Sequence, residues 1–211
     1  MSDERFLLKD MLNRETVTAL AACIAGVDTT FDADDFVADV LDDSWADLEL
    51  KQRTRHITET MAAHLPASYP RALDVLLDAA RDAPELGWEA MSFSDFVEVY
   101  GLDDPERSIP ALAEFTKLAS AEFAVRPFIL EYPDRMYATM HAWTDDGDWR
   151  VRRLASEGCR PRLPWGMALK PLQADPTPIL PILSALRLDP SEDVRRSVAN
   201  NLNDIAKDHP G

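Results

Sequence analysis

The amino-acid sequence predicts an all-α protein in which short helices stack into a repeat solenoid, an α-α superhelix. Apolar residues recur at intervals of three and four along most of the chain, as in helices that bury one face. No segment shows a convincing alternation of apolar and polar residues, and only 7 of the 211 residues are glycine. Both observations disfavour a loop-rich β protein.

The N-terminal half reads as a series of helices punctuated by proline. Apolar residues between Leu7 and Ile24 recur at helical spacing, and Gly26 marks an end of that segment. Pro66 and Pro70 interrupt the pattern further along the chain, because proline ends a helix or begins one. We expect a helix or a helix pair over residues 1–27, helices over 32–41, 48–65 and 70–80, and a packed helix with irregular flanks within 84–105.

The C-terminal half has a more regular rhythm from residue 106 onwards. Helical segments of about 9 to 15 residues alternate with short turns that carry proline, aspartate or glycine. We expect helices over residues 109–118, 119–131, 134–143, 149–157, 163–173, 178–186 and 193–207.

Internal repetition indicates how these helices are arranged. The motif VRRLA at Val151–Ala155 returns as VRRSV at Val194–Val198, and both copies follow an acidic, turn-prone lead. A period of roughly 40–47 residues with two helices per unit is typical of HEAT-type arrays, which curve and present a concave surface. We therefore expect an N-terminal helical region over 1–105 and HEAT-like repeats over 106–211, joined in one continuous solenoid with a concave basic face.

The charge of the chain is unevenly distributed. The formal net charge is −16, yet residues 148–196 carry nine basic and six acidic side chains. The local field matters more than the total charge for a polyanionic partner. This basic segment is therefore compatible with nucleic acid, although it does not require it.

Other classes of site have little support. Cys23 and Cys159 lie far apart, and the four histidines show no metal-ligand spacing, so we expect no metal and no cofactor. No glycine-rich phosphate loop is present, and no run of about 18 apolar residues could span a membrane. We expect a reduced, cytoplasmic setting near the nucleoid.

The repeated arginines are candidates for phosphate contacts. Guanidinium groups bind phosphate through two parallel hydrogen bonds, and the two VRR motifs would place them on successive helices. Alternatively, one arginine of each pair, Arg152 or Arg195, forms a salt bridge with the acids of the preceding repeat. Asp148 and Asp193, at the ends of the acidic leads, are expected to cap their helices.

Two glutamates are candidates for chemistry. Glu157 lies among arginines, where a carboxylate opposes polyanion binding unless it stabilises a positive charge or orients an arginine. Glu122 is flanked by small and apolar residues, and Arg126 at the i+4 position is its obvious structural partner. Both pairs are compatible with a purely structural role.

Aromatic and amide side chains complete the set of candidates. Trp165 follows the basic segment and Pro164, and it is the tryptophan expected to be exposed and to touch a base or sugar. Asn200 and Asn201 lie in the middle of an expected helix, although asparagine is a poor helix former. At least one of them is expected to hydrogen-bond to a neighbouring repeat or to nucleic acid.

At these residues the chain resembles the AlkC branch of the AlkC/AlkD superfamily, the HEAT-like-repeat DNA glycosylases that excise alkylated bases. The resemblance rests on EFAVRPF at 122–128, RRLASEGCRPRLPW at 152–165 and VRRSVANNLNDIAKDHP at 194–210. It is strong over 106–211 and otherwise rests on helical rhythm and on LKQRTRHITETMAAHLP at 50–66.

The resemblance implies an activity. It implies hydrolysis of the N-glycosidic bond of cationic bases of the 3-methyladenine or 3-methylcytosine class in double-stranded DNA, without base flipping, cofactor, membrane or obligate protein partner. It makes Glu122 and Glu157 the catalytic candidates. It implies phosphate contacts by Arg153, Arg160, Arg162, Arg195 and Arg196, and contact of Trp165 with the lesion or its sugar. We also expect DNA contacts by Arg126, Arg152, Asn200 and Asn201.

Two other functions remain open at this point. A non-catalytic HEAT-repeat DNA-binding protein would need the arginines but not the two glutamates, and a protein-interaction scaffold would need neither. Family members continue beyond the position of Gly211 with further repeats, and some add an immunoglobulin-like domain. The resemblance therefore implies that this chain ends within the repeat array.

Overall fold

The computed structural model describes residues 7–82 and 86–210. Every regular element in these ranges is a helix, which confirms the predicted all-α class. Four 3-10 helices lie at Leu8–Met11, Trp45–Asp47, Trp88–Ala90 and Thr177–Ile179. The α-helices are α1 (Arg14–Val27), α2 (Ala33–Val40), α3 (Leu50–His64), α4 (Tyr69–Asp82), α5 (Met91–Tyr100), α6 (Pro105–Phe115), α7 (Val125–Glu131), α8 (Pro133–Trp143), α9 (Trp149–Glu157), α10 (Lys170–Ala174), α11 (Leu180–Leu186) and α12 (Glu192–Asp208).

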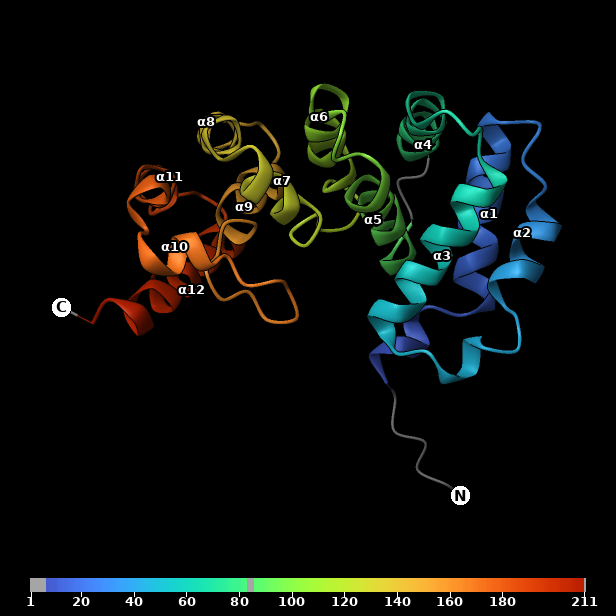
Figure 1. The fold of residues 1–211 in the computed structure, drawn as a ribbon, viewed down its shortest axis with the longest axis horizontal. Coiled ribbons are helices and arrows are strands. Elements are labelled where there is room, and N and C mark those ends of the chain that lie inside the picture. Colours follow the sequence, from blue (N-terminus) through green and yellow to red (C-terminus); the bar gives the residue numbers. More distant parts are fainter. Residues whose placement is uncertain (1–6, 83–85, 211) are drawn as a thin grey trace, which may run out of the picture.

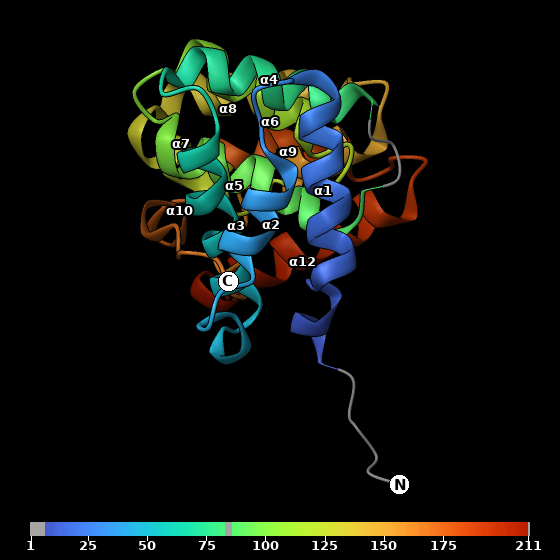
Figure 2. The ribbon, with the colours of Figure 1, turned by 90° about the vertical axis from the view of Figure 1, so that its right-hand side faces the viewer.

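The helices form an arch with an outer and an inner row (Figure 1). Helices α4, α6, α8 and α11 follow the outer edge, and α3, α5, α9 and α12 lie beneath them on the hollow side. Figure 2 shows α4, α6 and α8 of this outer row again along one edge of the molecule, with α3 and α12 below them. The loop between α9 and α10 projects toward the hollow side. The inner row and this loop therefore form the concave face.

Packing between α9 and α12 shows how one repeat meets the next. Val151 and Leu154 on α9, and Val194 on α12, are completely buried. Beside this apolar contact the amide of Asn201 donates to the Ser156 carbonyl oxygen at 2.8 Å. Apolar burial supplies most of the stabilisation. The hydrogen bond from the Asn201 side chain satisfies a buried polar group and fixes the register of the two helices.

The expected helix over 119–131 is wrong in its first half. Regular α-helix begins only at Val125. Glu122 lies in the turn just before it, and Ser120 lies in irregular structure. Pro127 explains the difference, because a longer helix would place its ring in the interior, where it clashes with the carbonyl four residues earlier. In the observed helix Pro127 occupies the first turn, where a missing N–H is tolerated.

The expected helix over 163–173 is also wrong. Only Lys170–Ala174 is helical, and residues 158–169 form an irregular loop. Pro161 and Pro164 lack amide protons, and each disfavours helical conformation in the residue before it.

The first N-terminal helix is shorter than expected, whereas α4 extends slightly beyond the expected range of 70–80. The helix expected over 1–27 begins at Arg14, where the Asn13 side chain caps the first turn, and residues 1–6 lie outside the described ranges. Residues 84 and 85 of the segment expected over 84–105 also lie outside them. None of the described helices is long and apolar enough to cross a membrane.

Candidate active site

A cleft of about 570 Å³ lies where the inner row meets the loop between α9 and α10. Apolar side chains form most of its wall, among them Trp88, Leu163 and Trp165. Its charged side chains are Lys51, Glu122, Arg153, Glu157 and Arg160. The structure thus gathers both glutamate candidates and the exposed tryptophan around one space, with one more formal positive than negative charge.

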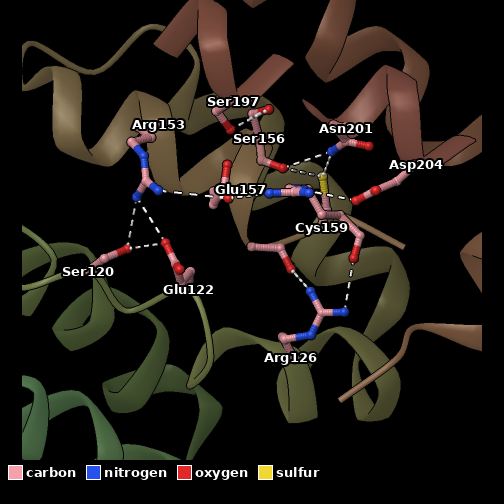
Figure 3. A network of polar contacts seen from close by, with 12 residues as sticks. Ser120, Glu122, Arg126, Arg153, Ser156, Glu157, Cys159, Ser197, Asn201 and Asp204 are labelled. Atoms are coloured by element: carbon pink, nitrogen blue, oxygen red, sulfur yellow. Dashed lines mark hydrogen bonds and ion pairs between the residues drawn. The ribbon is translucent and has the colours of Figure 1, made fainter. Parts of the chain in front are cut away.

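Glu122 enters the cleft from the turn before α7. Its Oε2 atom accepts hydrogen bonds from the Ser120 hydroxyl at 2.8 Å and from Arg153 Nη1 at 2.9 Å (Figure 3). Arg153 Nη1 also donates to the Ser120 hydroxyl at 3.1 Å. The partner of Glu122 is therefore Arg153 from α9, and the expected i+4 pair with Arg126 does not form.

Glu157 ends α9 and is nearly buried, with 6% of its side chain exposed. Arg160 Nη1 donates to its Oε1 atom at 2.7 Å, and Arg153 Nη2 lies 3.8 Å from the same oxygen. Arg160 Nε donates in turn to Asp204 of α12 at 2.9 Å. The carboxylate of Glu157 is thus fixed between two guanidinium groups, one of which is anchored on the next repeat.

The charge state of Arg160 follows from these contacts. Burial alone would lower the pKa of its guanidinium. Hydrogen bonds to Asp204 and Glu157 outweigh burial and raise the pKa above its ordinary value. Arg160 therefore remains cationic beside Glu157.

Trp165 lies at the tip of the loop, and 64% of the residue is exposed, as expected. Its backbone φ is 62°, which makes it the single non-glycine residue with positive φ in the described ranges. The left-handed region costs a residue with a Cβ atom about 1–2 kcal/mol. A bulky aromatic residue held there without burial suggests a functional constraint on this position.

Arg126 does not face the cleft, which corrects its assignment as a DNA contact. It is fully buried and donates to the carbonyl oxygens of Gly158 at 2.9 Å, Arg160 at 2.9 Å and Met167 at 2.7 Å. Burial lowers the pKa of its guanidinium to about 10, so it stays charged at neutral pH. Arg126 holds the two limbs of the loop together.

Arg152 is also committed to the protein. Its guanidinium forms a bidentate pair with Asp189, and its Nη1 atom donates to the carbonyl oxygen of Asp146 at 2.9 Å. Arg152 is therefore structural, which corrects its assignment as a DNA contact, but its acidic partner lies in the lead of the following repeat and not in the preceding repeat, as the alternative expected. Arg195 repeats the backbone part of this pattern, with Nη1 bonded to the carbonyls of Asp189 at 2.5 Å and Pro190 at 2.9 Å.

The two asparagines of α12 differ. Asn201 is fully buried and bonds to Ser156 of the neighbouring repeat, so its assignment as a DNA contact is corrected and the expected inter-repeat bond is confirmed. Asn200 is half-buried. The expected cap at Asp148 is present, whereas α12 begins after Ser191 and places Asp193 in its first turn.

Two of the remaining arginines are exposed and bound only by surface acids. Arg162 pairs with Asp208, its Nε atom lying 2.9 Å from Oδ2, and Arg196 pairs with Glu192 at 2.7 Å. Exposed pairs of this kind contribute little stability, because water and salt screen them. Both guanidinium groups can therefore exchange a surface carboxylate for a phosphate.

Sequence reasoning missed several residues of the site. Lys51, Ser120, Trp88 and Asp204 all contact or line it. Phe123 also lines it, and Lys51, Phe123 and Asp204 lie within the segments that carry the resemblance. No cluster of histidine, cysteine and acidic side chains suited to a metal ion occurs among the residues that the structure describes.

Comparisons with a family model, with curated proteins and with solved structures each give a match. A model of the HEAT repeat matches residues 179–209. The Bacillus subtilis (strain 168) protein named Uncharacterized protein YhaZ is 44% identical over 203 residues, which cover 96% of this chain and 56% of that protein. A structure of the Pseudomonas fluorescens alkylpurine DNA glycosylase AlkC, bound to DNA containing an abasic site analog, matches with a TM-score of 0.90 and 42% identity.

The structural match covers 98% of this chain and 57% of the AlkC chain, so this chain spans little more than half the length of the relatives it matches. Its stacked helix pairs, HEAT repeat and sequence identity agree with the expected resemblance. Over nearly its whole length the chain is similar in sequence and fold to the AlkC-type branch of the AlkC/AlkD superfamily of HEAT-like-repeat proteins.

Proposed function

We propose that this chain is a DNA glycosylase of alkylation repair, which hydrolyses the N-glycosidic bond of cationic N-alkylated bases in duplex DNA without base flipping. The observation that carries the proposal is the convergence of Glu122, Glu157 and Trp165 on one cleft of the concave face. The similar AlkC structure, an alkylpurine DNA glycosylase bound to DNA with an abasic site analog, supports the same activity.

The chemistry needs little from the protein. A base alkylated on a ring nitrogen already carries a positive charge, so it leaves as a neutral molecule with the electrons of the N-glycosidic bond and needs no general acid. Positive charge then develops on the sugar, as in glycoside hydrolysis. A nearby carboxylate stabilises this charge and accepts a proton from the water that attacks the sugar carbon.

The two carboxylates suit these roles differently. Glu157 is held rigidly between Arg153 and Arg160, so its oxygens are positioned before DNA arrives. Glu122 shares Arg153 and accepts a bond from Ser120. We assign Glu157 to the developing charge and Glu122 to the water or sugar. A DNA phosphate competes with Glu122 for Arg153, whose side chain is 27% exposed, and this exchange frees a carboxylate oxygen.

One observation favours a second function. Both glutamates are already paired with arginines, which is also how a non-catalytic DNA-binding protein would hold a basic cleft together. Such a protein would bind duplex DNA through Arg153, Arg162 and Arg196 and would release no base.

Release of free base from methylated duplex DNA distinguishes the two functions. The chain should release base, and Glu157→Gln should abolish release while duplex affinity is retained. Glu131→Gln makes the same change at an exposed residue at the end of α7, outside the cleft, and should leave release unchanged. Duplex binding without release by the parent chain would support the binding protein and contradict the glycosylase.

A further inference from the structure

Lys51, in the first turn of α3, joins two parts of the cleft that are distant in the sequence. Its Nζ atom donates to the carbonyl oxygen of Trp165 at 2.9 Å, across 114 residues. The same ammonium group lies 4.5 Å from the centre of the Phe123 ring, next to Glu122. A single side chain therefore connects the N-terminal part of the arch with the loop tip and with the turn that carries a candidate carboxylate.

The peptide unit that Lys51 binds is the one that needs support. Pro164 and Trp165 form the centre of a tight turn, which the Gly166 amide closes by donating to the Leu163 carbonyl at 3.1 Å. Trp165 occupies the position with positive φ, which favours glycine, whereas Gly166 itself has negative φ. If Gly166 took the positive φ and Trp165 returned to a negative φ, the indole would point in another direction. A contact that holds the Trp165 carbonyl therefore also holds the direction of its side chain.

Arg126 holds the base of the loop, and Lys51 holds its tip. Arg126 binds the carbonyl oxygens of Gly158, Arg160 and Met167, which lie on the two limbs. Among residues 7–82 and 86–210, the Lys51 ammonium is the group that donates to the Trp165 carbonyl. The indole is mostly exposed, so packing does not replace this bond.

We propose that Lys51 is a positioning residue that holds Trp165 in its left-handed conformation and aims the indole toward DNA on the concave face. The part of this inference that concerns turnover rests on the proposed glycosylase function. The competing role is a direct phosphate contact, in which the lysine would act as a point charge. The hydrogen bond to the carbonyl and the contact with the Phe123 ring favour positioning, because both direct the ammonium into the protein.

The first test needs neither DNA nor activity. Lys51→Met keeps the apolar stem over Phe123 and removes the ammonium, whereas Lys51→Arg keeps a donor. Hydrogen exchange at the Gly166 amide, which closes the turn, should accelerate about tenfold in Lys51→Met and return toward the parent rate in Lys51→Arg. Lys117→Met, which removes an exposed lysine paired with Glu114, is the matched control and should change nothing at Gly166.

The second test separates positioning from phosphate binding. At saturating methylated duplex, the rate of base release should fall about tenfold or more in Lys51→Met, because small misplacements of a positioned group slow chemistry strongly. The salt dependence of duplex binding should not change. Unchanged exchange at Gly166, or a salt slope reduced by about 0.9 with an unchanged release rate, would overturn the proposal. If the parent chain released no base, exchange at Gly166 and the salt slope would still decide it.

Discussion

Arg152 and Asp189 form a bidentate ion pair that joins α9 to the turn before α12. Nε lies 2.6 Å from Oδ2 and Nη2 lies 3.0 Å from Oδ1, and 13% and 4% of the two side chains are exposed. The pair raises the pKa of Arg152, and its hydrogen bond lowers the pKa of the Asp189 carboxyl. It therefore stabilises the contact between consecutive repeats, and Arg152 is not available to DNA.

Loss of this pair should destabilise the protein without weakening DNA binding. Asp189→Asn leaves a largely buried guanidinium without its counter-charge and should lower the free energy of unfolding by about 3 kcal/mol, measured by urea denaturation. Asp193→Asn, which removes an acid from an exposed pair with Arg196, should change it by less than about 1 kcal/mol. Equal stabilities for the two variants would contradict a structural role for the buried pair.

The same pair gives a pH dependence whose sign can be stated. The folded-state pKa of Asp189 is lowered, so its contribution is fully present above the carboxyl pKa of the unfolded chain, about 3.9. The contribution is lost as the pH falls through the lower folded-state pKa. Acid unfolding below about pH 4 should therefore be less steep in Asp189→Asn than in the parent. Parallel acid-unfolding curves would show that another carboxylate dominates.

The sequence predicted the elements that local signals define, and it missed those that distant contacts define. The helix expected over 149–157 matches α9 at both ends, because Asp148 caps its first turn. Pro161 and Pro164 explain why the loop over 158–169 is not helical, but its shape depends on a buried arginine on α7 that binds its carbonyl groups. Local periodicity carries no information about such contacts.

The candidate site shows the same division. Glu157 and Trp165 could be named because they lie within one segment of the sequence. Lys51 could not, because it reaches the cleft from 114 residues away and nothing in its surroundings on α3 distinguishes it from a surface lysine. Arg126 was misassigned for the complementary reason, because its motif EFAVRPF does not show that the guanidinium is buried against the carbonyl groups of a distant loop.

Glu122→Gln should slow base release, but less than Glu157→Gln. A glutamine at 122 can still accept a bond from Ser120 or Arg153, whereas a glutamine at 157 loses the charge between two guanidinium groups. We expect a rate loss of about 10-fold for Glu122→Gln and at least about 100-fold for Glu157→Gln, measured in single turnovers on methylated duplex. The opposite order would exchange the roles proposed for the two carboxylates.

The exposed arginines should govern the salt dependence of duplex binding. Arg162→Ala and Arg196→Ala should each reduce the slope of log affinity against log salt by about 0.9, because each removes one phosphate contact and its released counterion. Arg81→Ala is the matched control, since Arg81 is also exposed, pairs with Asp78 and lies on α4 of the outer row. A slope that also falls in Arg81→Ala would indicate a general charge effect in place of defined contacts.

Trp165→Gly should separate stability from function. Glycine adopts positive φ without strain, so the substitution relieves about 1–2 kcal/mol of conformational strain in the folded chain. Glycine also raises the entropy of the unfolded chain, which offsets part of this stabilisation. The indole is 64% exposed, so little buried area is lost. The free energy of unfolding should therefore stay the same or rise by up to about 1 kcal/mol, while base release and affinity for abasic-site DNA both fall. A marked loss of stability would mean that the indole supports the fold, and unchanged release would remove Trp165 from the site.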